Sequence, residues 1–167
     1  DRAPFGVDQE GHADSRLWVP PGEAERALYE FLSMPLFDTS AVFSRFRRLP
    51  GARCCADPVA SKERFVYVPG DRRDRAVLVA HADTVFDLEY GGRPLEHTLY
   101  RAGDVIHARG LPVGADDRAG CALLWMLRTS GHSLLVVDGE EGGCLGSSWL
   151  MNEHPEVADE LNAPSFM

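Results

Sequence analysis

The spacing of apolar residues along the chain changes from a helical period to the pattern of β-strands. Apolar positions three and four apart predict helices over about 23–33 and 40–48. Shorter runs of aliphatic, aromatic and β-branched residues then predict strands over 64–68, 76–80 and 133–137. The last two runs are continuously apolar, which is typical of strands that are buried on both faces of a sheet.

The second half of the chain adds a hairpin and two helices. Two short segments at 98–100 and 105–108 flank a Gly-Asp turn, and this arrangement predicts a β-hairpin. Helical spacing returns at 116–129 and at about 144–152. Helices that alternate with buried strands are typical of an α/β protein, so we expect a mostly parallel central sheet. The polar residues 1–16 are expected to form a loose leader.

The composition excludes several classes of protein. A chain of 167 residues with 44% hydrophobic and 26% charged residues suits one globular domain, and it excludes disordered, collagen-like and disulfide-scaffold proteins. The net charge of −9 argues against a general nucleic-acid binder, which normally carries a basic surface. No run approaches the ~20 apolar residues that cross a bilayer, so we expect no membrane partner.

The four cysteines favour reduced thiols over disulfides or a thiolate metal site. Cys54 and Cys55 are adjacent and cannot easily bridge each other, and no C-x-x-C pattern occurs. Cys121 and Cys144 stand in apolar stretches and are expected to pack in the core. Because reduced thiols are typical of the cytosol, we expect a soluble, cytoplasmic protein.

Three polar clusters follow predicted strands or open a helix, where α/β proteins build their binding sites. The first is His81-Ala82-Asp83, directly after the strand at 76–80. Alternate residues of an extended segment point the same way, so His81 and Asp83 can lie side by side. A histidine beside a carboxylate suits a metal ligand whose ring is oriented by the acid. The plainer alternative is a strand-end histidine with a solvated aspartate.

The second cluster, G-A-D-D-R-A-G over 114–120, opens the helix at 116–129. A helix N-terminus favours an acidic residue, so one of Asp116 and Asp117 can serve as a cap. A cap needs only one carboxylate, however. Two in a row between small residues therefore suggest that one turns inward while the other caps or orients.

The third cluster, D-G-E-E-G-G over 138–143, directly follows the strand at 133–137. Glu140 and Glu141 have no lysine nearby, so they are not a salt-bridged pair on a helix face. One carboxylate can bind a metal ion while its neighbour takes a proton from water. The alternative is an exposed acidic turn.

Taken together and in this order, H-x-D, G-A-D-D-R-A-G and G-E-E-G-G resemble the motifs of the di-zinc exopeptidase superfamily. This superfamily contains peptidase T, glutamate carboxypeptidase and the aminoacylases. The resemblance covers about 64–150 and implies a phosphorylase/hydrolase-like catalytic domain of three α/β/α layers. It also implies a zinc-dependent hydrolase that cleaves a peptide or N-acyl amino acid bond in a small substrate.

Carried over residue by residue, the resemblance implies a site for two zinc ions. His81 matches a zinc ligand, and Asp83 matches the acid that orients it. Asp116 matches the carboxylate that both ions share, and its peptide bond to the next residue matches one that is cis in the family. Glu140 matches the general base that activates the attacking water, and Glu141 matches a further metal ligand.

The chain also departs from this family. A further acidic ligand and a last histidine ligand have no clear counterpart, because Asp159 and Glu160 fall on a stretch expected to be helical and solvated. In the family a separate lid domain supplies dimer contacts, and we expect this chain to lack it. We therefore expect either the N-terminal part of a larger, homodimeric enzyme or a short relative that binds metal poorly. The second hypothesis makes the chain a non-catalytic binding module.

Overall fold

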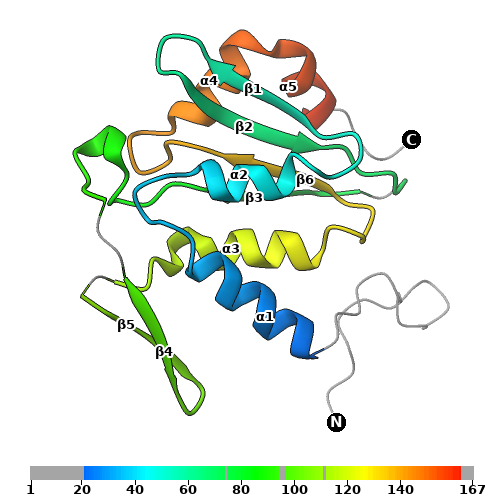
Figure 1. The fold of residues 1–167 in the computed structure, drawn as a ribbon. Helices are drawn as coiled ribbons and strands as arrows, with labels where there is room; N and C mark the ends of the chain where they lie inside the picture. Colours follow the sequence, from blue (N-terminus) through cyan, green and yellow to red (C-terminus); the bar gives the residue numbers. More distant parts are fainter. Residues whose placement is uncertain (1–20, 74, 95–96, 111, 163–167) are drawn as a thin grey trace, which may run out of the picture.

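A computed structural model describes residues 21–73, 75–94, 97–110 and 112–162 of the chain (Figure 1). The predicted loose leader, residues 1–16, lies outside this part. The described part of the chain begins with two helices, α1 (Pro21–Leu32) and α2 (Ser40–Phe46). They confirm the two helices predicted from the apolar spacing at 23–33 and 40–48. No helix among the described residues is long and apolar enough to span a membrane.

The central sheet has four strands in the order β1-β2-β6-β3. Their bounds are Arg53–Asp57 for β1, Lys62–Val68 for β2, Val77–His81 for β3 and Ser133–Val137 for β6. Strands β2, β3 and β6 were predicted, and β1 was not. Only β3 and β6 pair in parallel, whereas the β1–β2 and β2–β6 pairs are antiparallel.

The prediction of a mostly parallel sheet is therefore wrong for the described strands, and the sheet is mixed. The physical reason lies in β1, which a short turn over 58–61 joins to β2. A connection this short allows only an antiparallel pair. The sequence R-C-C-A-D of β1 lacks the apolar alternation by which strands are recognised.

Successive side chains of each strand point to opposite faces of the sheet, and they pack into two separate hydrophobic cores. Val66 and Leu134 point to the face covered by α1, α2 and α3 (Ala115–Met126), where Phe31, Phe43 and Phe46 are buried. Phe65, Tyr67, Leu135 and Val137 point to the other face, where α4 (Leu145–Glu153) and α5 (Pro155–Asn162) pack. Figure 1 shows α4 and α5 on one side of the sheet and α1 and α3 on the other.

The two apolar strands differ in burial. All five residues of β6 are buried, as predicted. In β3, by contrast, Ala80 is buried while Val79 is 57% exposed, so the prediction that this strand is buried on both faces is wrong. Among the described strands β3 pairs with β6 alone and forms an edge of the sheet.

The predicted hairpin is confirmed as β4 (Thr98–Ala102) and β5 (Val105–Arg109). It forms a two-stranded sheet of its own, which extends away from the central sheet in Figure 1. The chain then passes into α3, and α3 covers β3. This connection places the start of α3 beside the carboxyl end of β3.

Candidate active site

The three polar clusters meet at the carboxyl edge of the parallel pair β3 and β6. His81 is the last residue of β3 and lies opposite Val137, the last residue of β6. The amide of Ala82 extends this pairing by donating to the Val137 carbonyl at 2.8 Å. Parallel strands end at the same edge of a sheet, so the residues that follow His81 and Val137 are neighbours in space.

The ring of His81 lies between carboxylates. Its Nδ1 is 3.2 Å from the backbone oxygen of Asp83 and 3.5 Å from that residue's Oδ1. Its Nε2 is 3.1 Å from Asp116 Oδ1 and 3.9 Å from Glu140 Oε2. Burial alone would lower the pKa of His81, but the Asp83 hydrogen bond and the charges of Asp83, Asp117 and Glu140 raise it to about 9.

Asp83 is 0% exposed, which overturns the alternative of a solvated aspartate. Its Oδ1 accepts the amide of Glu140 at 3.2 Å, and its Oδ2 accepts the amide of Glu141 at 3.1 Å and the hydroxyl of Tyr90 at 3.2 Å. Burial works against the charge, but the hydrogen bonds from His81 and the two amides lower the pKa of Asp83 to about 2. One ionised side chain therefore joins the first and third clusters.

The two aspartates of the second cluster have separate roles. Asp117 Oδ1 accepts the amide of Gly120 at 3.0 Å, as a cap does, and its Oδ2 accepts the amide of His81 at 3.2 Å. The side chain of Asp116 is 85% exposed and faces His81. The bond between Asp116 and Asp117 is cis, as the resemblance implied. The expectation that one aspartate turns inward while the other caps or orients is met only in part, because Asp117 both caps the helix and holds the His81 amide, whereas Asp116 is exposed.

The third cluster is a tight turn that leads from β6 into α4. Gly139 and Gly143 have φ values of +73° and +97°, which glycine adopts without strain. The amides of Leu145 and Gly146 donate to the carbonyls of Gly139 and Asp138, at 2.8 and 2.7 Å. The turn therefore has a defined shape, which places two consecutive glutamates at the sheet edge.

Two side chains of this turn point away from the interior of the site. Cys144, expected in the core, is exposed, because it begins α4 with φ +62° at the end of the glycine-rich turn. Cys121 is buried as expected.

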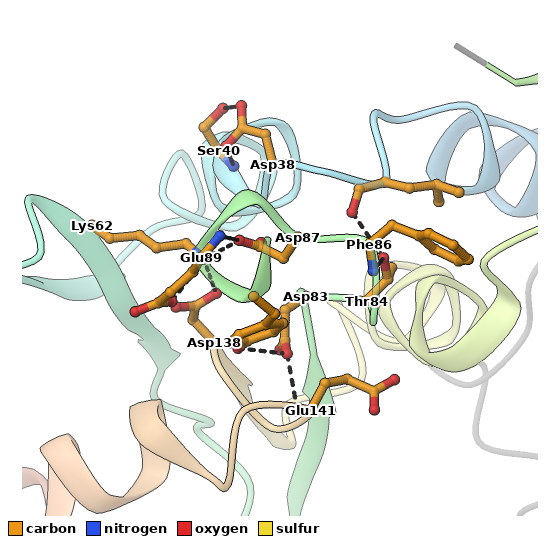
Figure 2. A network of polar contacts seen from close by, with 12 residues as sticks. Asp38, Ser40, Lys62, Asp83, Thr84, Phe86, Asp87, Glu89, Asp138 and Glu141 are labelled. Atoms are coloured by element: carbon orange, nitrogen blue, oxygen red, sulfur yellow. Dashed lines mark hydrogen bonds and ion pairs between the residues drawn. The ribbon is translucent and has the colours of Figure 1, made fainter. Parts of the chain in front are cut away.

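Figure 2 shows the side chain of Glu141 directed away from Asp83. Burial and the charge of Asp116 raise the pKa of Glu141.

The donors at this edge fit zinc in their chemistry, since zinc takes imidazole nitrogen and carboxylate oxygen. His81 Nε2 and Asp116 Oδ1 already face each other, and Glu140 is near. Within the described part of the chain, however, no group of three or more His, Cys, Asp or Glu side chains is placed to hold a metal ion. Glu160 is engaged elsewhere, with Arg53 and Tyr67.

A buried charge network behind the site was not predicted. Arg64 of β2 donates to Asp138 Oδ2 and to Glu89 Oε1, both at 2.8 Å. Lys62 Nζ lies 2.9 Å from Asp87 and 3.1 Å from Asp138, and Figure 2 shows it among these acids. Burial raises the pKa of Asp138 to about 6, although the charge of Lys62 lowers it. The sequence signal that could have indicated this network is the pair of cations two residues apart, Lys62 and Arg64, together with an acid, Asp138, directly after the strand at 133–137.

Comparison with known proteins bears on the fold. No protein-family model matches the sequence, and no similar curated protein was found. The crystal structure of aminopeptidase PepT from Bacillus cereus ATCC 10987 is similar over 78% of this chain and 39% of its own, with 16% identity and a TM-score of 0.57. The structure of aminoacylhistidine dipeptidase from Vibrio alginolyticus is similar over 75% of this chain and 29% of its own, with 18% identity and a TM-score of 0.48.

The likeness to the aminopeptidase concerns the fold. This chain is folded like part of that protein, so the expected resemblance to the di-zinc exopeptidases is confirmed at the level of fold. The chain spans about two fifths of the length of that aminopeptidase.

Proposed function

We propose that this chain carries part of the active site of a zinc-dependent hydrolase that cleaves a peptide or N-acyl amino acid bond. The observation that carries the proposal is the position of His81, held by Asp83 on one side and facing Asp116 and Glu140 on the other. The exopeptidase fold supports the reaction class, because it places this cluster at the edge where α/β proteins bind substrates. A small peptide or acylated amino acid is the proposed substrate.

His81, Asp116 and Glu141 would hold two zinc ions, with Asp116 shared between them and further ligands supplied from outside the described residues. Zinc supplies Lewis acidity, which polarises the substrate carbonyl and makes water a stronger acid. The Nε2 of His81 is directed towards Asp116 because Asp83 holds the opposite side of the ring. Asp116 is free to turn towards a ligand, since its side chain is largely exposed.

Glu140 is the proposed general base. Its amide is held by Asp83, while its carboxylate is half exposed and lies 3.9 Å from His81 Nε2. In this position Oε2 takes a proton from the water that attacks the carbonyl carbon. The same oxygen then returns the proton to the departing amide nitrogen, so that acid and amine form without a net change at the carboxylate.

Two neighbouring substitutions test this division of roles. Glu140→Gln should retain zinc while kcat falls by about 10²–10⁴-fold, because the proton acceptor is lost and KM is little affected. Glu141→Gln should instead lower the zinc content, because it removes a charged ligand. The measurements are zinc content by mass spectrometry and initial rates on a panel of dipeptides, tripeptides and N-acetyl amino acids.

Other outcomes discriminate between hypotheses. If Glu140→Gln loses zinc while Glu141→Gln retains it, the two roles are exchanged. If both variants stay fully active with zinc bound, the mechanism is wrong. A full-length protein that purifies without zinc in the absence of chelators, and takes up none, would favour the second hypothesis of a non-catalytic binding module.

A further inference from the structure

Tyr90 ends a short 3-10 helix, η2 (Leu88–Tyr90), and its hydroxyl reaches the buried acid of the site. It donates to Asp83 Oδ2 at 3.2 Å. Asp83 Oδ2 has one other hydrogen-bond donor in the described part of the chain, the amide of Glu141. A buried carboxylate is costly unless its oxygens are hydrogen-bonded, so the loss of either donor would weaken the hold on Asp83.

Two acidic residues beside Tyr90, Asp87 and Glu89, fix the position of η2. Asp87, which caps this helix, accepts the amide of Glu89 at 2.9 Å and pairs with Lys62 at the same distance. Glu89 itself pairs with Arg64. The charge network therefore ties η2 to strand β2, and Lys62 Nζ lies 6.0 Å from the centre of the Tyr90 ring.

The ring of Tyr90 also lies against the glutamate turn. A Cβ atom on Gly142 would lie 2.4 Å from Tyr90 Cε1, closer than such atoms approach. The absence of a side chain at Gly142 therefore allows the ring to rest on the turn that carries Glu140 and Glu141. Both the ring and the hydroxyl of Tyr90 thus contact groups that shape the segment between β6 and α4.

We propose that Tyr90 is a positioning residue that acts through Asp83: its hydroxyl holds the Asp83 carboxylate where it orients His81 and accepts the amides of Glu140 and Glu141. This proposal rests on the proposed function for its catalytic meaning. Its structural content is independent of zinc, because every contact on which it depends is made within the chain.

Hydrogen exchange in the metal-free protein tests the proposal directly. Tyr90→Phe keeps the ring and removes only the hydroxyl, so the fold should persist. The amides of Glu140 and Glu141 should exchange roughly tenfold faster, as expected for the loss of one hydrogen bond to a charged group. The amide of Gly146, which donates to Asp138 instead, should be unchanged. Exchange at Glu140 and Glu141 within twofold of the wild type would overturn the proposal, and so would equal acceleration at Gly146.

Tyr100→Phe is the matched control, because Tyr100 stands exposed on the hairpin and stacks on His107. It removes the same atom and should alter none of these amides. If it accelerates exchange at Glu140 and Glu141 as much as Tyr90→Phe does, the effect is not specific to Tyr90 and the proposal fails.

Zinc affinity of the full-length protein, measured by competition with a chromophoric chelator, provides a second readout. Tyr90→Phe should weaken Zn²⁺ binding by about tenfold, within the range typical of residues that support a metal ligand. The same substitution made in an Asp83→Asn background should change the affinity less than twofold, because Tyr90 acts through that carboxylate. An equal loss in both backgrounds would overturn the proposal. If the wild type binds no zinc, the proposed function fails, whereas the exchange experiment still decides the role of Tyr90.

Discussion

Gly146, the second residue of α4, allows that helix to begin directly against the sheet. A Cβ atom at this position would lie 2.3 Å from the carbonyl oxygens of both Arg64 and Asp138 and 2.7 Å from the Asp138 nitrogen. These are backbone atoms, so they cannot rotate away as a side chain does. Gly146→Ala should therefore separate α4 from β2 and β6 by about 1 Å and disturb the turn that carries Glu140 and Glu141.

The cost of this separation follows from the contacts that it strains. The hydrogen bonds from Gly146 to Asp138 and from Leu145 to Gly139 are each worth about 0.5–1.5 kcal/mol. Overpacking adds about 1–3 kcal/mol, and the better helix propensity of alanine returns at most about 1 kcal/mol. The free energy of unfolding should fall by about 1–6 kcal/mol, and Tm should fall by about 2–4 °C for each kcal/mol lost in a domain of this size.

Gly22 is the control, because it is the second residue of α1 and a Cβ atom added there would meet no described atom within 4 Å. Gly22→Ala should leave stability unchanged or raise it by up to about 1 kcal/mol. Thermal and urea unfolding, followed by circular dichroism in the presence of a chelator, measure both variants. A Gly146→Ala protein as stable as the wild type would refute the reasoning.

Two further predictions concern charge. In the metal-free protein the pKa of His81 is raised from 6.5 to about 9 and that of Asp83 is lowered from 3.8 to about 2, so their attraction contributes fully between about pH 4 and 6.5. Urea unfolding of wild type and His81→Gln should show a stability difference that shrinks from about pH 6.5 to above 9; a constant difference would contradict this. Arg118, which is 0% exposed, donates to the carbonyls of Pro35 and Asp38. Arg118→Met should cost about 2–4 kcal/mol in urea unfolding, and a loss below about 0.5 kcal/mol would show that these bonds contribute little.

The pattern of apolar residues predicted where most strands lie along the chain, but it did not predict which strands lie next to each other in the sheet. The runs at 76–80 and 133–137 read alike, but the second forms a central strand and the first an edge strand. The order of strands in a sheet depends on pairing between distant segments, and the apolar pattern of a single segment does not reveal its partners. Strand β1 was missed because its stability comes from pairing with β2 rather than from an apolar pattern of its own.

In the site, too, contacts between residues close in sequence could be predicted, whereas contacts that depend on the folded chain could not. The pairing of His81 with Asp83 could be predicted because alternate residues of an extended segment share a side, and the resemblance linked both to Asp116. Tyr90 could not be predicted, because no rule of spacing relates a residue in a short 3-10 helix to an acid seven positions earlier. Cys144 was misplaced because its apolar neighbours suggested burial, whereas the glycine turn exposes it.

The most direct test of the proposed metal site is anomalous diffraction at the zinc absorption edge, from crystals of the full-length protein grown with zinc. We expect an anomalous peak at the carboxyl edge of β3, with zinc at ~2.0–2.2 Å from His81 Nε2 and from a carboxylate oxygen of Asp116. A protein that binds zinc only at other positions, or that shows no peak beside His81 at saturating zinc, would contradict the account.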